Sequence, residues 1–271
     1  MEHDPLIKVS HFHKTYDKTV AAKDISFEVA PGEVLGLIGP NGAGKTTTLR
    51  ALTGIIHPTD GELSVDGFSV EQQPLEAKQR LAYIPDDPQL FHDLTVIEHL
   101  AFAAKTYRVD SPKDKIAQLI QDFELSEKQN ARAGDLSRGM RQKLAISCGY
   151  VHDPKAILFD EPLTGLDPAG IRKLKESIRD RSAAGTAIII SSHLLAMVED
   201  ICTHVMILKR GTQQFFGPIG DVRSAFSTSE SEASLEDIFF EATSDHAAEA
   251  PTGIVLAGLP GTGSSDVSST A

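Results

Sequence analysis

Short apolar runs alternate along the chain with segments of helical periodicity. Five of the runs predict strands, at residues 6–9, 25–29, 34–38, 156–159 and 186–190. The run Val34–Ile38 has almost no polar position, which is typical of a strand covered on both faces in a parallel sheet. Because helical patterns lie between and after these runs, the sequence predicts an α/β fold with helices flanking a sheet.

Residues 90–149 change to a helical pattern with strong start signals. Thr95 and Glu98 have the spacing of a capping box, and Ser111 is expected to be an N-cap with Pro112 at the first helical position. The apolar residues that follow recur at the i, i+3, i+4 and i+7 spacing of a one-faced helix, at Ile116, Leu119, Ile120 and Phe123. We therefore expect a helical subdomain inserted between strands of the sheet.

The composition is that of an ordinary globular protein, with 41% hydrophobic and 24% charged residues among 271. It argues against a wholly disordered, collagen-like or disulfide-framework chain. The 26 Lys and Arg against 38 Asp and Glu give a formal charge of −12. We expect no nucleic-acid partner, because phosphate backbones are bound by basic surfaces. Two cysteines without metal-ligand spacing indicate a reducing compartment.

The two ends of the chain add further expectations. The first ten residues lack the basic-then-apolar layout of a secretory signal, and no apolar run approaches the roughly 20 residues of a membrane span. Any membrane role would therefore need a partner. Residues 241–271 contain no Lys or Arg and are rich in Ala, Ser, Thr and Gly. They are predicted to be an acidic, low-complexity, disordered tail after a folded domain of residues 1–240.

A phosphate-binding loop follows the predicted strand at 34–38. The full GxxxxGK[ST] pattern is present, in residues Gly39, Pro40, Asn41, Gly42, Ala43, Gly44, Lys45, Thr46 and Thr47. Glycines let successive backbone N–H groups turn towards phosphate oxygens, and the following helix N-terminus adds partial positive charge. Lys45 is expected to reach the β- and γ-phosphates of ATP, and the Thr46 hydroxyl to bind Mg²⁺. The alternative, a glycine turn with a solvated lysine, is disfavoured by the strand, loop and helix context.

Two carboxylates end the apolar run at 156–159. Asp160 is expected at the carboxyl edge of the sheet, where ligands bind in open α/β sheets, and is placed to hold Mg²⁺ directly or through water. Glu161 follows at once and is placed to polarise a water that attacks the γ-phosphate. An acidic turn at a strand end is the plainer alternative, and the presence of Lys45 favours the catalytic interpretation.

These motifs together resemble those of the ATP-binding cassette ATPases, the nucleotide-binding subunits of ABC transporters. The resemblance covers about residues 6–240. It depends on an ordered set of motifs: Tyr16, the loop 39–47, the segment Leu136-Ser137-Arg138-Gly139-Met140-Arg141-Gln142, Asp160-Glu161, Gly165-Leu166-Asp167 and His193. It implies a P-loop NTPase core with a parallel-rich sheet, a small antiparallel β region and a helical subdomain at about 90–149.

The resemblance also implies roles for single residues. Two cassettes of the family pack head to tail, so Ser137, as a helix N-cap, and the Gly139 N–H would bind the γ-phosphate held by the partner's phosphate loop. Tyr16 would stack on adenine. His193 would contact the γ-phosphate and help to position the attacking water, and Asp167 would lie at the dimer contact.

Two segments depart from the family pattern. Residues 81–85 resemble a strand of the family that is usually followed by Gln, but here Asp86 follows. We expect Asp86 in the metal shell, although it adds negative charge beside the γ-phosphate. Arg138 and Met140 replace a Gly and a Gln of the family's common LSGGQ segment. The variant, and the segment at 234–240, resemble single-cassette exporter ATPases.

The resulting hypothesis is an ATP-hydrolysing motor subunit of a membrane exporter, peripheral at the cytoplasmic face of the cell membrane. It would act with separate transmembrane permease subunits and a second nucleotide-binding subunit, as a homodimer or heterodimer. A groove near residues 86–95 would pass dimer closure to the permease. Two alternatives stay open. One is a soluble cassette ATPase outside transport, and the other is a weakly hydrolysing half of a heterodimer, suggested by Asp86 and Arg138.

Overall fold

The protein is described here by a computed structural model, which describes residues 4–222 and 235–243. Most of the predicted tail, residues 244–271, lies outside the described residues, as does Ser234. The described part holds no helix long and apolar enough to cross a membrane.

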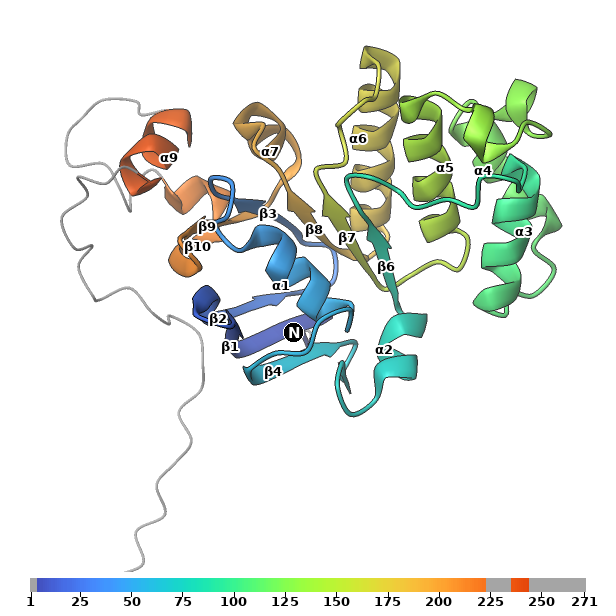
Figure 1. Cartoon of the computed structure of the whole chain (residues 1–271). Coiled ribbons are helices and arrows are strands. Elements are labelled where there is room, and N and C mark those ends of the chain that lie inside the picture. Colours follow the sequence, from blue (N-terminus) through green and yellow to red (C-terminus); the bar gives the residue numbers. More distant parts are fainter. Residues whose placement is uncertain (1–3, 223–234, 244–271) are drawn as a thin grey trace, which may run out of the picture.

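Ten strands of the described chain form one sheet (Figure 1). In chain order they are β1 (Ile7–Tyr16), β2 (Thr19–Val29), β3 (Val34–Ile38), β4 (Asp60–Val65), β5 (Phe68–Ser69), β6 (Leu81–Ile84), β7 (Ala156–Asp160), β8 (Ala187–Ser191), β9 (His204–Lys209) and β10 (Thr212–Pro218). Their spatial order is β5-β4-β1-β2-β10-β9-β3-β8-β7-β6. Strands β9, β3, β8, β7 and β6 pair in parallel, whereas β1, β2, β4 and β5 pair antiparallel.

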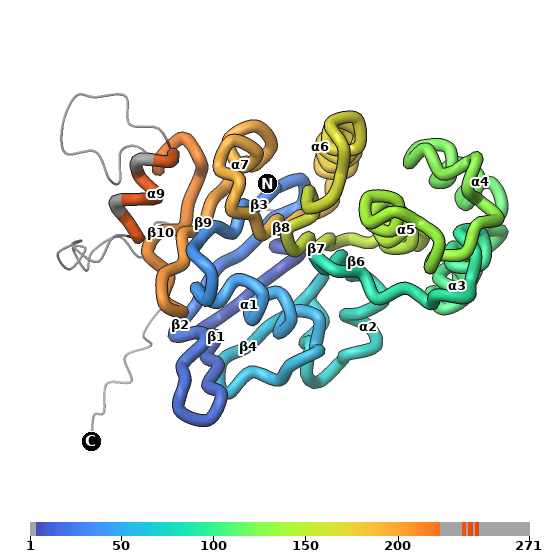
Figure 2. Tube along the Cα trace, turned by 45° about the horizontal axis from the view of Figure 1, so that its top comes forward, coloured from blue at the N-terminus to red at the C-terminus, as the bar shows by residue number. Residues whose placement is uncertain are grey.

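The helices lie between and beside these strands. They are α1 (Lys45–Leu52), α2 (Pro74–Gln79), α3 (Val96–Thr106), α4 (Lys113–Asp122), α5 (Arg138–Tyr150), α6 (Pro168–Ala183), α7 (Leu195–Ile201) and α9 (Leu235–Thr243). Short 3₁₀ turns occur at Ser126–Lys128, Ala133–Asp135 and Ile219–Asp221. Helices α3, α4 and α5 gather at one end of the molecule, beyond β6, and α9 lies at the opposite end (Figures 1 and 2). This group of three is the predicted helical subdomain.

Successive side chains along the parallel strands point to opposite faces of the sheet, and this divides the core into two clusters. In β3, Leu35 and Leu37 pack with α1 and the antiparallel strands, so α1 lies between the two parts of the sheet. Val34 and Ile38 of the same strand pack into the cluster that includes α5, α6 and α7. Every residue of β3 is buried, which confirms the prediction made from its continuous apolar run.

The start signals of the helical subdomain have mixed outcomes. The capping box is confirmed, because Thr95 Oγ1 accepts from the Glu98 N–H at 3.3 Å and the Glu98 carboxylate accepts from the Thr95 N–H at 2.8 Å. The start of α4 was predicted wrongly. Ser111 has a φ of 48° and is not the N-cap, Pro112 occupies that position, and the helix begins at Lys113. The chain between α3 and α4 turns through a left-handed conformation at Ser111, so the Ser111 backbone does not have the geometry of an N-cap.

Candidate functional site

The parallel strands bring the predicted site residues to one edge of the sheet. Leu37 of β3 and Asp160 of β7 both pair with Ser191 of β8, and Ile84 of β6 pairs with Phe159 of β7. The carboxyl ends of four strands therefore meet. The residues at or just beyond these ends are the phosphate loop 39–47, His193, Asp160 with Glu161, and Asp86.

The phosphate loop is shaped by glycines that no other residue replaces without strain. A Cβ at Gly44, which has a φ of +106°, would lie 2.5 Å from the Ala21 carbonyl oxygen, and one at Gly39 would lie 2.5 Å from that of Leu208. Gly44 is the N-cap of α1, and Lys45 is its first residue. The Lys45 ammonium donates to the Gly39 carbonyl at 2.7 Å and to the Pro40 carbonyl at 3.3 Å. The loop thus folds around its own lysine.

Lys45 is buried beside two carboxylates. Burial lowers the pKa of Lys45, and the charges of Glu161 and Asp160 oppose that shift. Asp160 is itself buried and accepts from the Tyr83 hydroxyl at 3.4 Å. Burial, with the Asp160 charge in support, raises the pKa of Tyr83 to about 12, so Tyr83 is a permanent donor. The site therefore combines one buried cation with two acids at the place where phosphates are expected.

The two predicted catalytic residues beyond the loop contact each other. His193 Nδ1 lies 2.7 Å from Glu161 Oε2, although the residues are 32 positions apart. Glu161 has a φ of 49°, a conformation that is costly for a residue with a side chain and that clusters at functional sites. Its N–H donates to the Ser191 carbonyl at 2.9 Å, which fixes the turn after β7 to the end of β8.

The oxygen donors at this edge suit a magnesium ion bound together with phosphate. Thr46 supplies a hydroxyl and Asp160 a carboxylate, and Ser191 Oγ, level with Asp160, is buried without a hydrogen-bond partner among the described residues. Within residues 4–222 and 235–243, no group of three or more His, Cys, Asp or Glu side chains is placed to hold a metal alone. Mg²⁺ is usually held by one or two protein carboxylates plus substrate phosphates, so the donor set fits it.

Asp86 has a different partner from the one expected. Its Oδ1 lies 3.3 Å from Arg138 Nη2, and both side chains are about half exposed. Thus Asp86 is at the expected edge of the sheet, but its carboxylate is paired with a cation of α5. Its place in a metal shell stays a prediction.

The residues expected to serve a dimer lie at helix starts and a strand end. Ser137 is the N-cap of α5, as predicted, and accepts from the Met140 N–H at 3.3 Å. Asp167 caps α6 by accepting from the Gly170 N–H at 2.9 Å. A Cβ at Gly139 would lie 2.6 Å from the Gly165 carbonyl oxygen, so the start of α5 packs directly on the turn before α6. Tyr16 ends β1 and is 43% exposed, with the Lys14 ammonium 4.9 Å from its ring.

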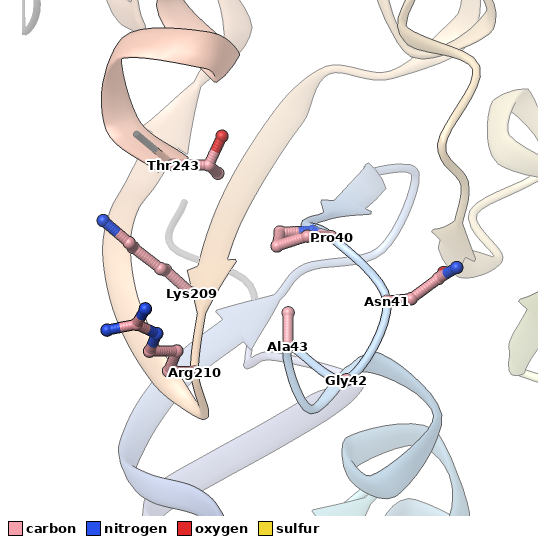
Figure 3. Close-up of a pocket in the computed structure, with 7 residues that line it drawn as sticks. All are labelled: Pro40, Asn41, Gly42, Ala43, Lys209, Arg210 and Thr243. Atoms are coloured by element: carbon pink, nitrogen blue, oxygen red, sulfur yellow. The ribbon is translucent and has the colours of Figure 1, made fainter. Parts of the chain in front are cut away.

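A cavity of about 260 Å³ adjoins the outer side of the phosphate loop (Figure 3). Pro40, Asn41, Gly42 and Ala43 line it together with Lys209 and Arg210 of the β9–β10 turn and Thr243 of α9. The last three were missed by the sequence analysis. The basic pair before Gly211 was the available signal. The pairing of β9 with β3 and the hydrogen bond from the Gly211 N–H to the Ala43 carbonyl bring that turn to the loop.

Comparisons with known proteins agree with this geometry. The ABC transporter family matches residues 22–164. The ABC-type transporter ATP-binding protein EcsA of Bacillus subtilis (strain 168) is 31% identical over 244 residues, which are 89% of this chain and 98% of EcsA. The Nod factor export ATP-binding protein I of Burkholderia pseudomallei (strain 1710b) is 35% identical over 76% of this chain and 68% of its own.

A solved structure gives the same result for the fold. The ATP-binding subunit of an ABC transporter superposes with a TM-score of 0.83 and 33% identity, covering 88% of this chain and 99% of that one. The fold class and the ATPase activity inferred from the motifs are therefore confirmed. The chain belongs to the ABC transporter family, as one of its ATP-binding, ATP-hydrolysing subunits.

Proposed function

We propose that this subunit drives a membrane exporter, in which ATP binding closes a pair of cassettes and hydrolysis by Glu161 reopens it. The observation that carries the proposal is the 2.7 Å contact between Glu161 and His193 at the edge that also holds Lys45 and Asp160. A carboxylate aimed by a histidine beside a phosphate loop is the arrangement needed to orient an attacking water.

Each residue at the edge has a distinct task in this mechanism. The loop amides and the N-terminus of α1 bind the phosphates, and the Lys45 ammonium exchanges its carbonyl partners for phosphate oxygens. Thr46 and Asp160 would hold Mg²⁺, which neutralises charge on the phosphates. Glu161 accepts a proton from the water, while His193 fixes the orientation of the Glu161 carboxylate.

One chain supplies only half of each proposed site. Ser137 and Gly139 lie at the N-terminus of the 13-residue helix α5, which favours a bound anion. The Ser137 hydroxyl caps this helix and could also donate to a phosphate oxygen bound there. In the proposed dimer this anion is the γ-phosphate of the partner's nucleotide. The exposed ring of Tyr16 is the stacking surface for adenine.

A hollow near the predicted coupling groove suits a permease segment. It has a volume of about 490 Å³ and is lined by Phe91, His92, Asp93, Leu94 and Phe102. The Phe91 and Phe102 ring centroids are 5.4 Å apart and both residues are more than half exposed, so together they form an apolar patch on the surface. An apolar segment of a transmembrane partner would cover them, and this docking would hold the chain at the cytoplasmic face of the membrane.

Export is the proposed direction of transport. A relative of 35% identity carries the name Nod factor export ATP-binding protein I. The Ser137-Arg138-Gly139-Met140 segment resembles that of exporter ATPases and supports the same direction.

The test is capture of the intact transporter with tagged Glu161→Gln in native membranes, in the presence of ATP and Mg²⁺. Steady-state hydrolysis by the purified variant is expected to fall by about two orders of magnitude or more, while ATP binding is kept, because a general base supplies that much of the rate. Glu176→Gln, an exposed glutamate of α6, is the matched control and should hydrolyse normally. Unchanged hydrolysis in Glu161→Gln would falsify the mechanism.

The captured chains decide between transport and its alternative. Recovery of a multi-span protein with Glu161→Gln supports the motor function. If Phe91→Ser keeps ATP hydrolysis but no longer recovers that protein, the result also supports the docking hollow. Recovery of soluble partners alone would favour a cassette ATPase outside transport.

A further inference from the structure

Two of the departures from the family pattern, Asp86 and Arg138, contact each other. They are 52 positions apart, and their charged groups lie 3.3 Å from one another. Asp86 lies on the connection that leaves β6 for the helical subdomain, and Arg138 is the first residue of α5. The ion pair therefore joins the edge of the sheet to the subdomain.

Arg138 also rests on the turn that follows Glu161. A Cβ at Gly165 would lie 3.0 Å from both Cγ and Cδ of Arg138, so the absence of a side chain at Gly165 makes room for the arginine stem. The Gly165 φ of +82° belongs to the conformation that glycine favours. The same turn is closed by the Thr164 N–H, which donates to the Glu161 carbonyl at 3.2 Å. Arg138 of α5 thus contacts two other segments, the loop that holds Asp86 and the turn that follows Glu161.

The charge of Asp86 matters because of what lies beside it. Ile84 pairs with Phe159, and Asp86 and Glu161 each follow one of these paired residues by two positions, at neighbouring strand ends. Asp160 and Glu161 already face the buried ammonium of Lys45. A third, unpaired carboxylate at this edge would repel the phosphates of ATP.

We propose that Arg138 is a positioning residue: it neutralises Asp86, holds that carboxylate away from the bound phosphates and fixes the Glu161 turn against α5. The inference rests on the proposed nucleotide site, but not on export or on a permease. It contrasts with the expectation that Asp86 ligates Mg²⁺, which requires the carboxylate to be free.

The test is a double-mutant cycle of Arg138→Gln, Asp86→Asn and the double variant in the full chain. The readouts are the Kd of ATP with EDTA present, the Kd with Mg²⁺, and amide hydrogen exchange of residues 86–95 without nucleotide. Arg138→Gln should weaken ATP binding in EDTA about two- to fivefold, the range of a half-exposed ion pair. Asp86→Asn should bind ATP in EDTA at least as tightly as wild type does, and the double variant should return to the wild-type affinity.

Hydrogen exchange should rise in residues 86–95 in both single variants, because each breaks the tie to α5. Arg179→Gln, which breaks the exposed pair with Asp200 between α6 and α7, is the matched control and should change neither readout. Two outcomes overturn the proposal. Additive effects of the two substitutions would remove the coupling, and a loss of Mg²⁺-dependent affinity in Asp86→Asn, with or without Arg138, would identify Asp86 as a metal ligand. A failure of permease capture leaves this cycle intact, because it measures binding by the isolated chain.

Discussion

Acidification should destabilise this protein through His152, which lies in the turn between α5 and β7. Its ring stacks on Tyr107 at the end of α3, with centroids 3.7 Å apart and planes 6° from parallel. Both ring nitrogens are buried. Burial lowers the pKa of His152 to about 4, against opposition from the Leu81 backbone and the Asp153 carboxylate. This contact joins the helical subdomain to the sheet, so its loss affects the joint between them.

The size of the effect follows from the difference in proton binding. The pKa of His152 is near 6.5 in the unfolded chain and about 4 in the folded one, so the unfolded state takes up its proton first as the pH falls. The contribution is complete above pH 6.5 and is lost progressively as the pH falls from 6.5 to 4. One pKa unit corresponds to about 1.36 kcal/mol, which gives about 2 kcal/mol lost by pH 5 and about 3 kcal/mol in full.

The assay is urea denaturation at pH 8 and pH 5 of wild type and of His152→Phe, which keeps an aromatic ring against Tyr107 but cannot titrate. The free energy of unfolding of wild type should fall by about 2 kcal/mol more than that of the variant. His57→Asn removes an exposed histidine and should leave the wild-type dependence nearly unchanged. Equal pH dependences of wild type and His152→Phe would refute the reasoning.

Two further predictions concern the scaffold of the site. Gly36→Ala in β3 places a Cβ 2.5 Å from Val198 Cγ1 of α7, so it should lower the free energy of unfolding by about 1–3 kcal/mol. Val198→Ala combined with Gly36→Ala should recover part of this loss, as measured by urea denaturation of both variants. Thr95→Ala removes the N-cap of α3 and should lower the free energy of unfolding by about 1 kcal/mol, or the thermal midpoint by about 3 °C. Thr95→Ser should keep both the cap and the midpoint. An unchanged midpoint in Thr95→Ala would contradict the capping role.

Much of the fold, and the phosphate loop of the site, could be predicted from local sequence patterns. The apolar run Val34–Ile38 is a strand with those bounds, and the capping box at Thr95 forms as spaced. The predicted phosphate loop lies between a strand and a helix, as expected, because its pattern depends on contiguous residues. By contrast, β1 and β2 extend well past their apolar runs, since antiparallel pairing continues through polar, exposed positions that periodicity does not register.

What the sequence alone determined, then, is the set of chemical groups and the local elements that carry them: the phosphate loop, Asp160 with Glu161, and His193 in motif order. The tertiary structure decided which groups touch. Strand order and register bring His193 to Glu161 and the β9–β10 turn to the phosphate loop, and the packing of α5 beside β6 brings Arg138 to Asp86. The physical reason is that these contacts join residues tens of positions or more apart through strand pairing and helix packing, whereas periodicity and capping act within one helix or strand.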